Sequence, residues 1–69
     1  MKDVFAERLK ELRLERKLKQ EELGKAIGVD GTAISAWELS KNIPTFDKVI
    51  KLAILFNVSL DYLGGLRDY

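Results

Sequence analysis

Apolar residues recur along this chain at the spacing of one buried helical face. Phe5, Leu9 and Leu12 follow an i, i+4, i+7 pattern, which predicts a helix over about residues 3–16. The same kind of pattern recurs in later segments: 20–27, 31–39, 46–56 and a short stretch that starts after Ser59 and ends before Gly64. No stretch sustains the alternation of apolar and polar residues that a half-buried strand shows. The fold class is therefore predicted to be all-α.

The residues between these segments are typical of helix ends. Gly28 and Asn57 each follow a predicted helix, at the position where the backbone often turns left-handed. Asp30, Thr45 and Ser59 are candidate N-caps, because their short side chains carry an oxygen that can accept a hydrogen bond from the first turn. The side chains expected in the core are Phe5, Leu9, Leu12, Leu23, Ile27, Ile34, Trp37, Phe46, Val49, Ala53 and Phe56.

Residues 20–39 carry the most specific pattern. Their two short helices are joined by the turn Gly28-Val29-Asp30, so the helices must cross steeply. Such a crossing needs a small residue where the helices touch, and Gly24 is placed there. The turn needs a residue that tolerates positive φ, and Gly28 supplies it. Together with the apolar residues that point inward from both helices, these features predict a helix-turn-helix.

Several residues occur together at the spacing found in one family. They are Gln20, Gly28, the pair Trp37-Glu38, Pro44 and the pair Val58-Ser59. With them the chain resembles the lambda-repressor-like (Cro/cI-type) DNA-binding domains over about residues 5–64. The resemblance implies a compact five-helix bundle that forms a single domain over residues 1–69, with the helix-turn-helix at 20–39 and a tail or linker from residue 64.

The resemblance also implies a function. In this family the third helix enters the major groove of duplex DNA, where base edges can be told apart. The chain is expected to be a phage or prokaryotic transcriptional regulator, and more narrowly a repressor that acts as a homodimer on a pseudo-palindromic site. The alternative is a protein–protein interaction module of the same fold, such as an antitoxin-like or dimerising component, with weak or no DNA binding. The third helix allows that alternative, because the outward residues Gly31, Ala36 and Leu39 leave its face bare. Residues 30–40 also contain two carboxylates and no basic side chain, which weakens the expectation of direct base readout.

By correspondence with the family, a set of residues is expected at the DNA. Lys19, Gln20, Lys41 and Asn42 fall where phosphates are held, and Gly31, Thr32, Ser35 and Ala36 fall near the bases. Lys19 and Gln20 stand at the start of the second helix, where free N–H groups and the helix dipole attract an anion. Direct readout is expected from the hydroxyl groups of Thr32 and Ser35, since glycine and alanine have no side chain that can bond a base. Lys19 also stands where the family has Ser or Thr, which should remove the capping box of the second helix.

Two further features follow from the resemblance. Arg13 and Glu38 are expected to form a partly buried ion pair, because the family pairs an arginine late in the first helix with the glutamate after the tryptophan. The dimer contact is expected at apolar residues near the C-terminal end: Ile54, Leu60, Leu63 and Leu66. Ile54 stands where the family usually has a charged residue, which favours an apolar interaction surface there.

Composition excludes several other classes. The 69 residues include no His and no Cys, so metal sites built from these residues, thiol nucleophiles and disulfides are excluded. The chain has neither a glycine-rich phosphate loop nor an evident catalytic pair, so no enzyme activity, cofactor or small-molecule ligand is expected. Its most apolar window is far shorter than the ~20 residues of a membrane helix, and a cytoplasmic protein is expected. The net charge of +1 does not by itself indicate a nucleic-acid partner.

Overall fold

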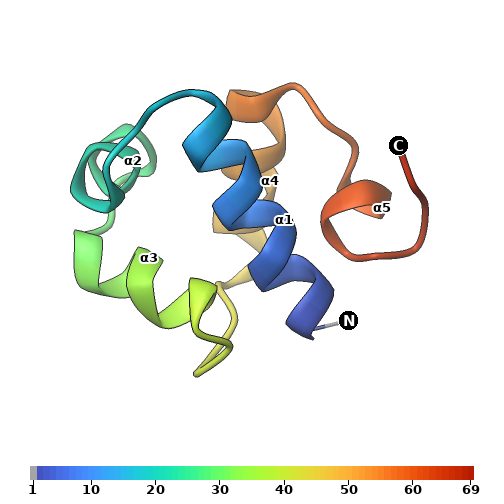
Figure 1. Ribbon diagram of the computed structural model, residues 1–69, viewed down its shortest axis with the longest axis horizontal. Helices are drawn as coiled ribbons and strands as arrows, with labels where there is room; N and C mark the ends of the chain where they lie inside the picture. Colours follow the sequence, from blue (N-terminus) through green and yellow to red (C-terminus); the bar gives the residue numbers. More distant parts are fainter. Residues whose placement is uncertain (1) are drawn as a thin grey trace.

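The computed structural model describes residues 2–69, which form five helices and no strand. The helices are α1 (Lys2–Glu15), α2 (Gln20–Ile27), α3 (Gly31–Glu38), α4 (Phe46–Phe56) and α5 (Leu60–Leu63). Figure 1 shows α2 and α3 as a pair on one side of the molecule and α5 with the end of the chain on the other, with α1 and α4 between them. The prediction of an all-α, five-helix fold is confirmed.

Short polar side chains begin two of the helices as expected. Asp30 Oδ1 accepts the backbone N–H of the third residue of α3 at 2.9 Å, and Ser59 Oγ accepts that of the third residue of α5 at 3.0 Å. Thr45 is the N-cap residue of α4, but its side chain makes no capping bond. Its hydroxyl instead donates to the carboxylate of Asp47 at 2.5 Å.

Left-handed residues end the helices at the expected places and at two others. Gly28 follows α2 with a φ of 85°, and Asn57 follows α4 with a φ of 56°. Lys17, after α1, and Ser40, after α3, adopt the same conformation with φ values of 56° and 59°. Because a side chain costs ~1–2 kcal/mol in this region, these two turns depend on the packing of the helices that they connect.

All five helices contribute to one core. The largest fully buried side chains are Leu9, Leu23, Ile34, Leu52 and Leu63, one from each helix. The assignment of Phe46 to the core is wrong, since its side chain is 69 % exposed. Phe46 is the first residue of α4 and lines a surface groove, while the core face of α4 runs through Leu52 and Ala53.

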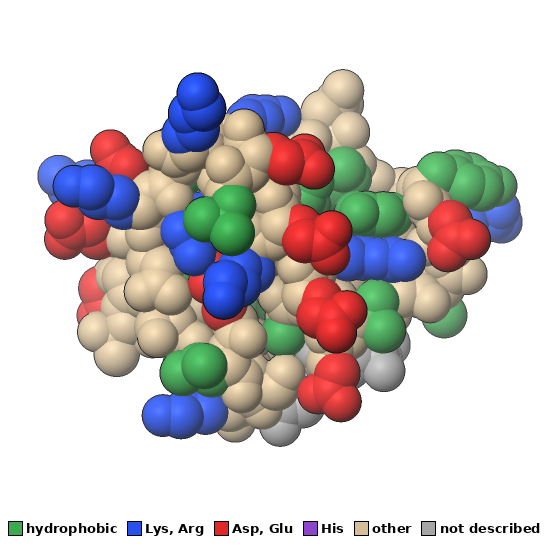
Figure 2. All heavy atoms as spheres, viewed as in Figure 1, with side chains coloured by type: hydrophobic (Ala, Val, Ile, Leu, Met, Phe, Trp, Pro, Cys, Tyr) green, Lys and Arg blue, Asp and Glu red, His purple; other side chains and the backbone are tan. Residues whose placement is uncertain are grey.

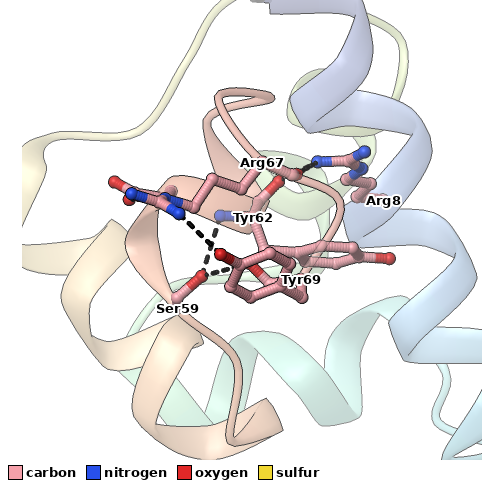
Figure 3. A network of polar contacts seen from close by, with 6 residues as sticks. Arg8, Ser59, Tyr62, Arg67 and Tyr69 are labelled. Carbon is pink, nitrogen blue, oxygen red and sulfur yellow. Dashed lines mark hydrogen bonds and ion pairs between the residues drawn. The ribbon is translucent and has the colours of Figure 1, made fainter.

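Residues 64–69, the C-terminal tail, pack back against α1 and α5 (Figure 3). Arg8 on α1 donates to the backbone carbonyl oxygen of Tyr62 and, at 2.8 Å, to a second carbonyl oxygen in the tail. Its guanidinium also lies 4.2 Å from the centre of the Tyr62 ring. At the other end of the tail, Ser59 Oγ donates to the carbonyl oxygen of Tyr69 at 2.8 Å. One arginine therefore ties the tail to the first helix.

Candidate nucleic-acid interface

The crossing of α2 and α3 depends on Gly24. A Cβ atom at this position would lie 2.5 Å from the carbonyl oxygen of Val29 and 2.9 Å from the backbone of Asp30. Both are backbone atoms, so any larger residue would push the turn away from α2. The backbone N–H of Val29 donates to the carbonyl oxygen of Gly24 at 2.8 Å, which holds the turn in place.

A second glycine brings the first turns of α2 and α3 together. A Cβ atom on Gly31 would lie 3.1 Å from both the backbone nitrogen and the Cα atom of Glu21. The missing side chain of Gly31 therefore points at α2. Its contribution in this structure is to allow close approach of the two helices, whatever it contacts in a complex.

The close approach leaves a shallow surface depression between the two helix starts. It is lined by Lys19, Gln20, Glu21, Gly31, Thr32 and Ser35. The structure thus brings together five of the residues that were expected at DNA, from two different helices and the turn before α2. Ala36 is half-buried on α3, and Lys41 and Asn42 are exposed in the loop after α3, but none of the three lines this depression.

Glu21 is the residue of the depression that sequence reasoning missed. Its carboxylate is exposed beside the expected phosphate and base contacts. The signal was available, since the second residue of a helix lies in the same turn as the first. A carboxylate on this surface repels phosphate, so the depression combines one cation with one anion.

The start of α2 keeps half of a capping box. The Lys19 side chain is an ammonium group without a lone pair, so it cannot accept the bond that a serine or threonine would. The reciprocal half is present, because the Glu22 carboxylate accepts the backbone N–H of Lys19 at 2.7 Å. The expected loss of the capping box is therefore partial: only the hydrogen bond that the side chain of the N-cap residue would accept is missing.

Arg13 and Glu38 form a two-pronged ion pair between α1 and the end of α3. Arg13 Nε lies 2.6 Å from Glu38 Oε2, and Nη2 donates to Oε1 at 3.0 Å. The side chains are only 10 % and 4 % exposed. The remaining Arg13 nitrogen donates to the carbonyl oxygen of Leu18 at 2.8 Å. Hydrogen bonding to Glu38 raises the pKa of Arg13 above its ordinary value, so this guanidinium stays charged.

The same carboxylate also orients Gln20. Gln20 Nε2 donates to Glu38 Oε1 at 3.2 Å, which leaves one amide hydrogen outside this bond. Glu38 therefore contacts side chains from α1 and from the first position of α2 while standing at the end of α3. These contacts of Glu38 with Arg13 and Gln20 hold α1, α2 and α3 in position relative to one another.

The residues expected at a dimer contact do not all reach the surface. Leu63 is completely buried, so its assignment to the contact is wrong; α5 turns this side chain into the domain's own core. Ile54 and Leu66 are 75 % and 74 % exposed, and Leu60 is 40 % exposed. Leu60 lies between the other two, because it lines one depression with Ile54 and a neighbouring groove with Leu66.

On the face drawn in Figure 2, basic and acidic side chains both occur. Figure 2 shows acidic side chains in a row over α1, where Asp3, Glu7 and Glu11 are exposed. Within residues 2–69 there is no group of acidic side chains placed to hold a metal ion. None of the helices described is long and apolar enough to cross a membrane.

Comparison with known proteins gives consistent matches. A helix-turn-helix family model matches residues 9–63. The HTH-type transcriptional regulator YobD of Bacillus subtilis is 37% identical over 65 residues, which are 94% of this chain and 58% of that protein. The repressor protein C2 of Salmonella phage P22 is 37% identical over 60 residues, which are 87% of this chain and 28% of that protein. The chain thus spans little more than half the length of YobD.

Solved structures match as well. The crystal structure of the P22 c2 repressor in complex with a synthetic operator has a TM-score of 0.83 and 37% identity, over 87% of this chain and 91% of that chain. The solution structure of the DNA-binding domain of the same repressor has a TM-score of 0.81 and 34% identity, over 100% of this chain and 93% of that chain.

Proposed function

Since this chain belongs to the helix-turn-helix family, we propose that it binds duplex DNA as a transcriptional regulator and acts as a repressor. One observation carries the proposal. The glycine crossing of α2 and α3 places a helix start that attracts anions beside the hydroxyl-bearing face of the next helix. This arrangement suits a duplex, because α2 can cross the phosphate backbone while α3 enters the major groove. The P22 c2 repressor, which matches over most of this chain, was solved on an operator and supports the same assignment.

The proposed contacts divide into phosphate and base contacts. Phosphates are held by Lys19 and Gln20 at the start of α2 and by Lys41 and Asn42 in the loop after α3, and bases are approached by Gly31, Thr32, Ser35 and Ala36. The amide hydrogen of Gln20 that is not bonded to Glu38 is the donor for phosphate. The hydroxyl groups of Thr32 and Ser35 can each donate and accept, so they can bond either kind of base edge.

The proposed assembly is a two-fold homodimer on a pseudo-palindromic site. Its contact surface is formed by Ile54, Leu60 and Leu66, which are exposed and apolar. Two copies of α3 would then lie one DNA turn apart, ~34 Å, and the bound dimer would block a promoter. This role has no catalytic step and places the protein in the cytoplasm with the DNA.

The test is selection of duplexes from a random library, followed by binding titrations at increasing salt. A DNA-binding protein should enrich one site with two-fold symmetry and should lose affinity steeply as salt rises, through release of counterions. Lys41→Ala should weaken binding about equally to all sequences and lower the salt slope by about 1. Lys10→Ala, which removes an exposed charge from α1, is the matched control and should leave the slope unchanged.

Thr32→Ala tests the base contacts. Selection with this variant should return a changed site, because a hydroxyl that bonds a base edge is removed. An unchanged preference would assign Thr32 no role in readout. For the dimer, Ile54→Glu should reduce cooperative binding to the two half-sites, whereas Leu14→Glu, at another exposed leucine, should not.

A protein-binding module is the second candidate. Two observations favour it: α3 carries no basic side chain, and the exposed carboxylate of Glu21 lies in the depression. Such a module should show little affinity for random duplex DNA even at low salt, and selection should enrich no sequence. That result would end the DNA-binding proposal.

A further inference from the structure

The outward face of α3 carries no charged side chain, and the two carboxylates that flank it are engaged in other contacts. Asp30 caps the helix by accepting a backbone N–H at 2.9 Å. Glu38 is turned inward, where it binds Arg13 and is 4 % exposed. What remains on the outward face is Thr32, Ser35, Ala36 and Leu39.

Leu39 is the large side chain of that face. It is 62 % exposed, so it contributes little to the core of this domain. Its backbone N–H donates to the carbonyl oxygen of Ser35 at 3.0 Å, which continues the helical bonding of α3 through this residue. Residues four apart lie on the same helix face, so Leu39 extends the face that already carries Ser35 and is three residues from Ala36.

We infer that Leu39 is a specificity-determining residue that contacts the C5 methyl group of a thymine in the major groove. The inference rests on the proposed function, since it needs α3 to lie in that groove. The C5 methyl group of thymine is the apolar feature that a base pair presents there. Other groups on the base edges are hydrogen-bond donors and acceptors, and a leucine placed against them would leave them dehydrated and unpaired. The leucine therefore favours thymine both by contact and by exclusion of other bases.

The expected size of the effect follows from the area buried. Removing one methyl group from an apolar contact should weaken binding about fourfold, the amount associated with one buried methylene group. If the protein binds as a dimer, the same change in both half-sites should weaken binding by about fifteenfold.

The experiment uses the best duplex recovered from the random library as its probe. Each thymine is replaced in turn by deoxyuridine, which lacks only the C5 methyl group. Affinity is measured at one salt concentration for the parent protein, for Leu39→Ala and for Leu14→Ala. Leu14 is a matched control, because it is a 54 % exposed leucine on α1, outside the depression between α2 and α3.

With the parent protein and Leu14→Ala, a single deoxyuridine at the contacted position of either half-site should weaken binding about fourfold. With Leu39→Ala the same replacement should have no effect, because the contact is already gone. A second arm replaces that T·A pair by C·G or by 5-methylcytosine·G, and the methylated pair should bind the parent more tightly than the unmethylated one.

The inference is overturned if no deoxyuridine position weakens binding of the parent, or if Leu39→Ala keeps the full penalty. Both results are distinct from failure of the proposed function, in which no duplex is enriched and no probe exists.

Discussion

Replacing Glu38 by glutamine should destabilise the domain severely. The change keeps the shape of the side chain but removes its charge, so Arg13 becomes a guanidinium that is 10 % exposed and has lost its counter-ion. Its hydrogen bond to the carbonyl oxygen of Leu18, at 2.8 Å, cannot replace a carboxylate. Breaking a buried ion pair by removing one partner costs about 3–5 kcal/mol. For a domain of this size the total stability is about 3–10 kcal/mol, so the variant should be largely unfolded or close to it.

The measurement is urea denaturation followed by circular dichroism, with thermal melts beside it. A loss of 3 kcal/mol should lower the melting temperature by at least about 12 °C, since domains of 60–100 residues lose about 4–8 °C per kcal/mol. Glu11→Gln is the matched control, because Glu11 is exposed on α1. It should change the free energy of unfolding by less than about 0.5 kcal/mol.

A double variant separates an orphaned charge from general loss of packing. Arg13→Met combined with Glu38→Leu removes both charges and keeps apolar volume, so it should be more stable than either single variant. The reasoning is refuted if Glu38→Gln unfolds within about 1 kcal/mol of the parent. It is also refuted if the losses of the two single variants simply add in the double variant.

Three further predictions concern other parts of the molecule. Gly24→Ala should cost several kcal/mol in urea denaturation, because its Cβ would lie 2.5 Å from a backbone oxygen of the turn between α2 and α3; a loss below about 1 kcal/mol would contradict the close packing. Arg8→Gln should release the C-terminal tail, because it removes the hydrogen bonds from the Arg8 guanidinium to two backbone carbonyl oxygens. Amide hydrogen exchange in the tail should become faster, with little change in the overall unfolding midpoint, and an unchanged exchange rate would show that these bonds do not hold the tail. The hydrogen bond from the Thr45 hydroxyl lowers the pKa of Asp47, so its contribution to stability is present above the unfolded pKa and is lost as the pH falls through the lower folded pKa. An NMR titration of Asp47 should show this lowered pKa, and Thr45→Val should raise it again; equal midpoints in the two proteins would exclude the hydroxyl as the cause.

Local signals in the sequence were sufficient for the helices and for the turn between α2 and α3. Apolar spacing follows directly from the helical repeat, and Gly28 and Asn57 mark ends that few other residues tolerate. The same spacing misplaced Phe46. Leu63 was misplaced for another reason, because it was grouped with the other apolar residues near the C-terminal end as a dimer contact. Periodicity shows which face of a helix is apolar, but not whether another element covers that face near the helix end. Phe46 lies at an uncovered end of α4, and Leu63 lies where α5 meets the core.

Contacts between distant residues were harder to predict. The bond from Arg8 to Tyr62 joins residues 54 positions apart, and no local rule relates an arginine on the first helix to a carbonyl oxygen in the fifth. The place of Glu21 in the first turn of α2 was readable from the sequence, but its closeness to α3 depends on how closely the two helices approach, which is set by the missing Cβ of Gly31. The candidate DNA contacts were placed by family resemblance, because the sequence shows the face of α3 but not what faces it.

Stability and the proposed recognition geometry meet at one carboxylate. Glu38 ends α3, binds Arg13 on α1 and accepts a hydrogen bond from Gln20, the first residue of α2. The proposed phosphate donor is therefore oriented by the same group that neutralises the buried guanidinium. The two hydrogen bonds from Arg13 and the one from Gln20 share the two carboxylate oxygen atoms of Glu38, so a change at Glu38 must disturb all three bonds together. DNA binding by Glu38→Gln should accordingly be weaker than its folded fraction alone predicts, while Glu11→Gln should bind as the parent does.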